Sequence, residues 1–135
     1  MVLLIGLASP TSVATAVGAG HRLGIPIMLD TPTATLDATW VRDVERLGVD
    51  ALVVTTNVDH GHRGAHPLDR ARQLRAWTQL PVAVSGGFGP TDRHILTSGD
   101  WDIAIVGRSI TEALDPAAAT HHTLRLTDRA NRTTA

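Results

Sequence analysis

The sequence contains no cysteine, no lysine and no tyrosine, and Phe88 is its only phenylalanine. Without cysteine there can be no disulfide, no thiolate metal ligand and no cysteine nucleophile. Without lysine there can be no Schiff base and no lysine acting as a general acid. The net charge of −1 gives no general attraction to nucleic acid or to an anionic membrane. The sequence therefore predicts neither a nucleic acid nor a membrane as a partner.

Long apolar runs are also absent, since none reaches the ~18 residues needed to span a bilayer. The apolar start faintly resembles a signal peptide, but no basic segment precedes it and the run stops at Gly6, so we interpret it as a buried strand. The expected location is the cytoplasm. At 135 residues the chain can form one domain with a core, but it is short for a complete eight-stranded barrel of ~250 residues.

One unit recurs five times: a run that is apolar at every position, followed by an amphipathic stretch. Such runs fit strands buried on both faces, as in parallel sheets. The runs are Val2–Leu7, Ile25–Leu29, Ala51–Val54, Pro81–Val84 and Ile103–Val106. Helix signals lie between and after them, including Gly48 as a stop, Pro67 in a first turn and Asp115 as a cap. We predict an α/β domain of five βα units over 1–126 and a polar tail that frays over 127–135.

Two architectures accommodate five βα units. One is a doubly wound, flavodoxin-like sheet, and the other is part of a (β/α)8 TIM barrel. Length and pattern alone favour the doubly wound sheet, because it closes its own core at this size. In both architectures ligands bind where the strands end, so the residues just past each apolar run are the candidate site.

The clearest signal at these strand ends is a pair of glycine turns, Gly86–Gly87 and Gly107–Arg108. Glycine lets the backbone approach an anion closely, so that N–H groups can point at phosphate oxygens. Arg108 adds a fixed positive charge with a bidentate fork of donors. Such turns after the last two strands are typical of the phosphate site of many barrels. We therefore predict that this end of the sheet binds a sugar phosphate.

Asp30 is the candidate for acid–base chemistry, because an aspartate that ends an apolar strand is costly to bury without a partner. It could bind substrate hydroxyls or begin a turn. The loop after the third run contains His60, His62 and His66. Their spacing is not that of two ligands on one helix face, which favours a loop of solvated histidines and no metal site.

Two stretches resemble a known family. They are 81–89, Pro-Val-Ala-Val-Ser-Gly-Gly-Phe-Gly, and 101–119, Trp-Asp-Ile-Ala-Ile-Val-Gly-Arg-Ser-Ile-Thr-Glu-Ala-Leu-Asp-Pro-Ala-Ala-Ala. They look like the end of 3-hexulose-6-phosphate synthase and are similar to 3-keto-L-gulonate-6-phosphate decarboxylase. Both enzymes belong to the orotidine 5'-phosphate decarboxylase superfamily of ribulose-phosphate-binding barrels. The similarity runs from Val2 to about Leu126 and implies that the chain is the C-terminal part of such a barrel, strands 4–8.

The resemblance also implies roles for individual residues. Gly86, Gly87, Gly107 and Arg108 match the family's phosphate site. Asp30 matches its acidic residue at the end of the fifth strand, which contacts substrate near the reacting carbons. The implied reaction passes through a magnesium-stabilised enediolate of a ketose phosphate, such as ribulose 5-phosphate, which the synthase adds to formaldehyde.

The sequence departs from the family where the metal is held. The family's metal-binding carboxylates and its Asp-x-Lys motif lie on the second and third strands, which have no counterpart here, and Thr55 stands where the family usually has a histidine. We therefore expect no cofactor from this chain itself, and Mg²⁺ only if a partner supplies the ligands. Because five parallel strands cannot close an eight-stranded barrel, we expect a homodimer or a complementing barrel-half chain.

Several functional hypotheses follow from the sequence. The first is a lyase, an aldehyde-lyase or carboxy-lyase by resemblance, that is incomplete or inactive alone. The second is a non-catalytic phosphosugar-binding or regulatory subunit. A protein like 3-keto-L-gulonate-6-phosphate or orotidine 5'-phosphate decarboxylase is a third, and a flavodoxin-like nucleotide-binding domain is a fourth.

Overall fold

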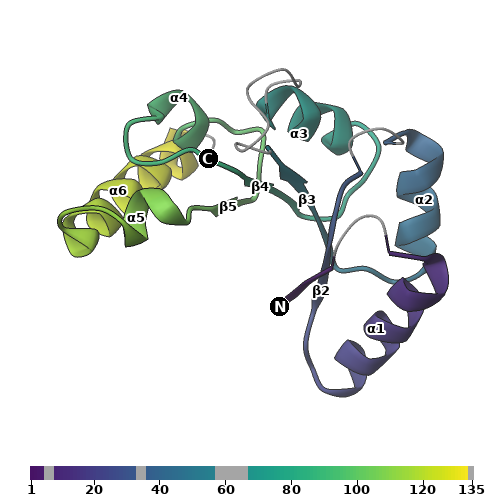
Figure 1. Cartoon of the computed structure of the whole chain (residues 1–135). Coiled ribbons are helices and arrows are strands. Elements are labelled where there is room, and N and C mark those ends of the chain that lie inside the picture. The colour runs from purple at the N-terminus through teal and green to yellow at the C-terminus, as the bar shows by residue number, and fades with distance from the viewer. Residues whose placement is uncertain (5–7, 33–35, 57–66, 134–135) are drawn as a thin grey trace.

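The computed structural model describes residues 1–4, 8–32, 36–56 and 67–133, and their strands form one parallel sheet (Figure 1). The strand order is β1-β2-β3-β4-β5. The strands are β1 (Val2–Leu4), β2 (Ile27–Asp30), β3 (Ala51–Thr55), β4 (Val82–Ser85) and β5 (Ile103–Ile105). Every predicted apolar run overlaps one of them. The sequential order makes the doubly wound alternative wrong, because the order of that sheet reverses at a switch point.

Helices follow the strands and lie along the outer side of the curved sheet in Figure 1. They are α1 (Pro10–Arg22), α2 (Ala38–Arg46), α3 (Pro67–Arg75), α4 (Arg93–Leu96), α5 (Arg108–Thr111) and α6 (Pro116–Thr133). The predicted cap is present, since the backbone N–H of Ala118 donates to Asp115 Oδ1 over 2.9 Å. Among the described residues, no helix has the length and apolarity needed to cross a membrane.

Helix α6 continues past Leu126 to Thr133 and so includes most of the polar tail. The fraying of this tail, expected from the sequence, stays a prediction. Leu126 is buried in the core, so the helix is anchored at this point and can extend beyond it. Polar composition alone did not reveal this, because a helix needs only part of its length packed to persist. The domain boundary at residue 126 stays a prediction.

The sheet is buried on both faces, as the uniformly apolar runs predicted. Leu52 and Val54 of β3 pack with helix residues in the larger core cluster. Val53, between them, points to the opposite face and joins a second cluster whose buried members all come from strands. Leu52 and Val53 are both 0% exposed, so both faces of β3 are fully buried. Helices therefore cover one face of a sheet whose other face is strand-lined, the arrangement of a (β/α)8 barrel wall.

The sheet is open among the described strands. Strand β1 pairs only with β2, and β5 only with β4. Val2 of β1 is 44% exposed and Ile105 of β5 is 37% exposed. The described fold is thus a partial (β/α)8 barrel of five βα units, as the resemblance implied. The numbering of its strands as 4–8 of the whole barrel remains an inference from that resemblance.

Two aspartates tie the amino ends of neighbouring strands together in the same way. Asp50 precedes β3, donates its backbone N–H to Ile27 O over 2.8 Å, and accepts the Ile27 N–H at its Oδ2 over 2.7 Å. Asp102 precedes β5 and makes the same reciprocal pair with Val82, at 2.8 Å in both directions. Each carboxylate thereby satisfies a backbone donor at the start of a buried strand.

A basic side chain from an earlier helix lies against each of these carboxylates. His21 Nε2 of α1 lies 3.0 Å from Asp50 Oδ2, and Arg75 Nη1 of α3 lies 2.7 Å from Asp102 Oδ2. The hydrogen bond from the Ile27 N–H is the main reason that the pKa of Asp50 lies below its usual value, and the contact with His21 lowers this pKa further. Partial burial raises the pKa of Asp102, but hydrogen bonds from the Val82 N–H and Arg75 outweigh burial and lower it.

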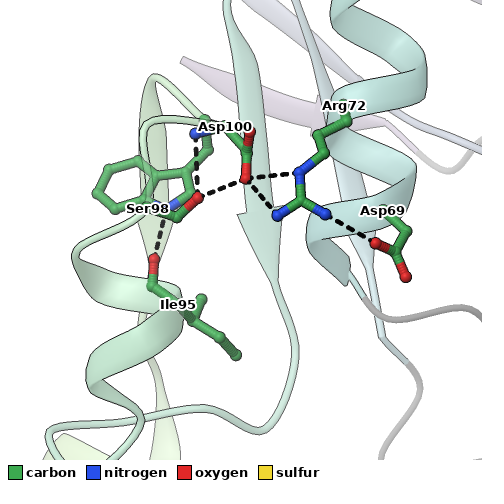
Figure 2. Close-up of polar contacts among 6 residues, drawn as sticks. Asp69, Arg72, Ile95, Ser98 and Asp100 are labelled. Atoms are coloured by element: carbon green, nitrogen blue, oxygen red, sulfur yellow. Dashed lines mark hydrogen bonds and ion pairs between the residues drawn. The ribbon is translucent and has the colours of Figure 1, made fainter.

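A third ion-paired aspartate joins α3 to the loop before β5 (Figure 2). Asp100 Oδ2 accepts a hydrogen bond from Arg72 Nε over 2.9 Å and from the Ser98 hydroxyl over 2.6 Å. Arg72 also contacts Asp69 of its own helix at 2.9 Å. Burial raises the pKa of Asp100, but these donors outweigh burial and keep the pKa below its usual value. Arg72 thus fixes the position of the chain just before β5 enters the sheet.

Candidate functional site

Polar side chains end three adjacent strands at the carboxyl edge of the sheet. Asp30, Thr55 and Ser85 are the last residues of β2, β3 and β4, and Thr55 is in register with Ser85. A cavity of about 870 Å³ opens at this edge. Its lining includes all the residues predicted from the sequence, namely Asp30, Gly86, Gly87, Gly107 and Arg108. The fold therefore brings them together, while their roles in binding or chemistry stay predictions.

Asp30 lines this cavity beside a hydroxyl. Thr55 Oγ1 donates to Asp30 Oδ1 over 2.9 Å. Burial raises the pKa of Asp30 above its usual value, and hydrogen bonds with the Thr55 side chain and the Thr31 backbone offset part of this increase. A half-buried carboxyl with a raised pKa is suited to exchange a proton or to bind a hydroxyl. Thr55 thus contacts the carboxyl, although the resemblance put a histidine at this position.

The turn after β4 requires glycine at its first position. Gly86 has φ +109° and Gly87 has φ +69°. A Cβ on Gly86 would lie 2.1 Å from the carbonyl oxygen of Thr56, so the backbone of this turn lies directly against the end of β3. Among the described residues, no acceptor is found for the N–H of Gly86 or Gly87. These donors are therefore available to an anion in the cavity.

The turn after β5 faces the same cavity. Gly107 precedes α5, and a Cβ placed on it would meet no atom within 4 Å. Arg108, the first residue of α5, is exposed and lines the cavity. The open space at Gly107 leaves room for a ligand to approach the backbone, beside the Arg108 guanidinium.

Sequence reasoning missed the short helix α5 and the second wall that it gives to the cavity. Glu112, the residue that caps the end of this helix, and Ala113, just past it, line the cavity together with Arg108. The spacing of Arg108 and Glu112, four residues apart, is that of about one helical turn and was a usable signal. The expected helix at Asp115 obscured it, because α5 and α6 are separated by only a brief turn.

The described residues do not supply a magnesium site. No group of three histidine, aspartate or glutamate side chains within the described ranges lies close enough to hold a metal ion. The metal-binding carboxylates that the resemblance implies belong to strands with no counterpart here, and Asp30 alone does not replace them. The described residues therefore do not form that metal site, and we derive no step through a metal. His60, His62 and His66 lie outside the described residues.

Fold and cavity together define a class of protein, a partial (β/α)8 barrel with a cavity at the carboxyl ends of its strands. No protein-family model matches the chain. Its sequence resembles 3-hexulose-6-phosphate synthases: it is 29% identical to that of Staphylococcus epidermidis over 120 residues. The match covers 88% of this chain and 57% of the synthase. The chain thus spans little more than half the length of this relative.

Solved structures agree with this resemblance. The 3-hexulose-6-phosphate synthase of Salmonella typhimurium superposes with a TM-score of 0.82 at 25% identity, over 95% of this chain and 61% of that one. The 3-keto-L-gulonate-6-phosphate decarboxylase of Streptococcus mutans, solved in complex with a sugar phosphate, also gives 0.82 over 95% of this chain and 61% of that one. At 19% identity, this second likeness supports the fold alone. The predicted resemblance to part of a ribulose-phosphate-binding barrel is confirmed.

Proposed function

We propose that this chain binds a ketose phosphate such as ribulose 5-phosphate and contributes to a site like that of 3-hexulose-6-phosphate synthase. The observation that carries the proposal is that two glycine turns and Arg108 line one cavity with Asp30. Backbone N–H groups of Gly86 and Gly87 and the Arg108 guanidinium would hold the phosphate. Asp30 would contact the polyol end of the ligand. A cavity of about 870 Å³ is ample for a pentose phosphate.

Aldehyde-lyase chemistry at this site needs groups beyond these 135 residues. The sequence contains no lysine, whereas the family uses an Asp-x-Lys motif. We propose that a complementing barrel-half chain supplies the remaining groups, together with ligands for Mg²⁺. A second copy in a homodimer, the other proposed partner, would cover the open edges of the sheet but would bring no lysine. The cytoplasm is the proposed location, and 1–126 the proposed extent of the sugar-phosphate-binding domain.

The phosphate grip can be tested by thermal unfolding with ribulose 5-phosphate and with inorganic phosphate. A ligand at about 100 times its Kd stabilises the folded state by ~2.7 kcal/mol, which corresponds to an increase in Tm of roughly 10 °C. Arg108→Ala should abolish most of this increase, because a hydrogen bond to a charged group contributes about 1.5–3 kcal/mol.

Arg125→Ala is the matched control. Arg125 is exposed on α6 and does not line the cavity, so its loss changes the net charge equally. The control should keep the full increase in Tm. An Arg108→Ala protein that is stabilised as much as the control would show that the guanidinium does not hold the phosphate.

Catalysis by the 135 residues alone is expected to be absent. We expect no formaldehyde-dependent formation of hexulose phosphate above background, because loss of one charged catalytic group alone typically costs several orders of magnitude in rate. A 3-hexulose-6-phosphate synthase assayed in parallel provides the positive control. Turnover by the purified chain would contradict this expectation and place the missing chemistry within these residues.

A non-catalytic role is the second candidate, and the absence of lysine favours it. A phosphosugar-binding or regulatory subunit would need the grip but not the lysine. The two candidates differ when a complementing chain is added: turnover on addition favours the enzyme, whereas ligand binding without turnover favours the regulatory subunit.

A further inference from the structure

The two turns that form the proposed grip touch each other at Ser109. This residue follows Arg108 in α5 and lines the cavity. Its hydroxyl donates to the carbonyl oxygen of Phe88, in the turn after β4, over 2.9 Å. The hydrogen bond is partly buried and joins residues 21 positions apart. It therefore connects the halves of the grip that belong to β4 and to β5.

Steric contact at the same point leaves little freedom between the turns. A Cβ built on Gly89 would lie 2.5 Å from Ser109 Cβ and 2.6 Å from Ser109 Oγ. No real Cβ tolerates such distances, so only glycine lets the two turns come this close. The Gly89 N–H in turn donates to Asp92 Oδ2 over 2.9 Å. The turn after β4 is thus held by Asp92 from its own side and by Ser109 from the other.

We propose that Ser109 is a positioning residue that sets the separation between the two halves of the anion grip. The inference rests on the proposed phosphate site, since it assigns no new ligand. An anion held from two separate turns is bound tightly only if the turns already stand at the right distance. Ser109 and Gly89 together maintain that distance before the ligand arrives.

A double-mutant cycle tests this proposal, using inorganic phosphate as the probe and calorimetry for its Kd. Ser109→Ala removes the hydrogen bond, and Gly89→Ala forces the turns apart. Each variant should weaken phosphate binding, Ser109→Ala by roughly three- to tenfold, the typical effect of one hydrogen bond. The double variant should be no weaker than Gly89→Ala alone, because both changes break one contact.

Amide NMR adds a readout that a general loss of stability would not move. In the unaltered chain, saturating phosphate should shift the amide signals of both Gly86 and Gly107. In Ser109→Ala the shift at one of the two turns should be smaller, because that turn no longer reaches the bound anion. Ser12→Ala removes a serine hydroxyl of α1 that contacts the Ser9 hydroxyl over 2.9 Å; Ser12 does not line the cavity, so this variant should behave as the unaltered chain does.

The outcomes are distinguishable. If the unaltered chain binds no phosphate, the proposed function fails and this inference fails with it. If it binds phosphate and Ser109→Ala binds equally well with unchanged amide shifts at both turns, the grip stands and the positioning role is overturned. Additive losses in the cycle also overturn it. If Gly89→Ala does not fold, Ser109→Ala measured by NMR and calorimetry still decides.

Discussion

Gly86→Ala is expected to unfold much of the carboxyl edge of the sheet and to abolish phosphate binding. The substitution combines two costs. An alanine at φ +109° is strained by about 1–3 kcal/mol. Its Cβ would also stand 2.1 Å from the Thr56 carbonyl oxygen, an overpacking that typically costs about another 1–3 kcal/mol. We expect a loss of roughly 2–6 kcal/mol in the free energy of unfolding, measured by urea denaturation.

Gly24→Ala separates the two costs. Gly24 has φ +67°, but a Cβ there would meet no atom within 4 Å. This control should lose only the conformational part, about 1–2 kcal/mol, and should bind phosphate normally. If Gly86→Ala proved as mild as Gly24→Ala, the close approach of the turn to Thr56 would not constrain the site.

Phe88→Ala should have the second largest effect, since it removes the anchor of the same turn. Phe88 is only 4% exposed and packs in the main core cluster. Its truncation should cost about 3–5 kcal/mol of the free energy of unfolding. Because Phe88 follows Gly87 directly, the turn should also lose its position over the cavity. We therefore expect phosphate affinity to fall with stability, by calorimetry at a temperature where the variant is still folded.

Leu96→Ala is the matched control for core loss without loss of the turn. Leu96 is 0% exposed in the same core cluster but belongs to α4 and does not line the cavity. We expect a comparable loss of stability, about 2–5 kcal/mol, with phosphate affinity preserved. Equal loss of affinity in both variants would mean that binding reports stability in general and not the position of the turn.

Runs of apolar residues predicted the sheet well because burial on both faces leaves a strong trace in the sequence. Residues 51–54 are apolar throughout, and β3 is buried on both faces over these residues. The gathering of Asp30 with the glycine turns was also predictable, because parallel strands end at one edge. The architecture itself was not: length and pattern favoured a doubly wound sheet, and only the resemblance pointed to a barrel.

Other features depend on three-dimensional contacts that carry no local signal. Asp92 directly precedes α4, where a helix cap would lie, but its side chain accepts the Gly89 N–H and caps no helix donor. The position of the turn after β4 determines that the Asp92 carboxylate accepts the Gly89 N–H and not an N–H of the helix. Likewise, the sequence alone could not link Ser109 to Phe88, because the separation of two residues along the chain does not reveal whether they touch in the folded structure.

The two edges of the sheet are under different constraints. At the amino edge, Asp50 and Asp102 each fasten a neighbouring strand through a reciprocal pair of hydrogen bonds, and a basic side chain from a helix reinforces each one. None of these residues lines the cavity at the carboxyl edge. The contacts at the amino edge thus fix the register of the strands independently of the carboxyl edge. We therefore expect that turns at the carboxyl edge can be exchanged or lengthened without shifting the sheet. The same fastening would leave the frame of the sheet unchanged when its carboxyl-edge loops are redesigned for a new ligand.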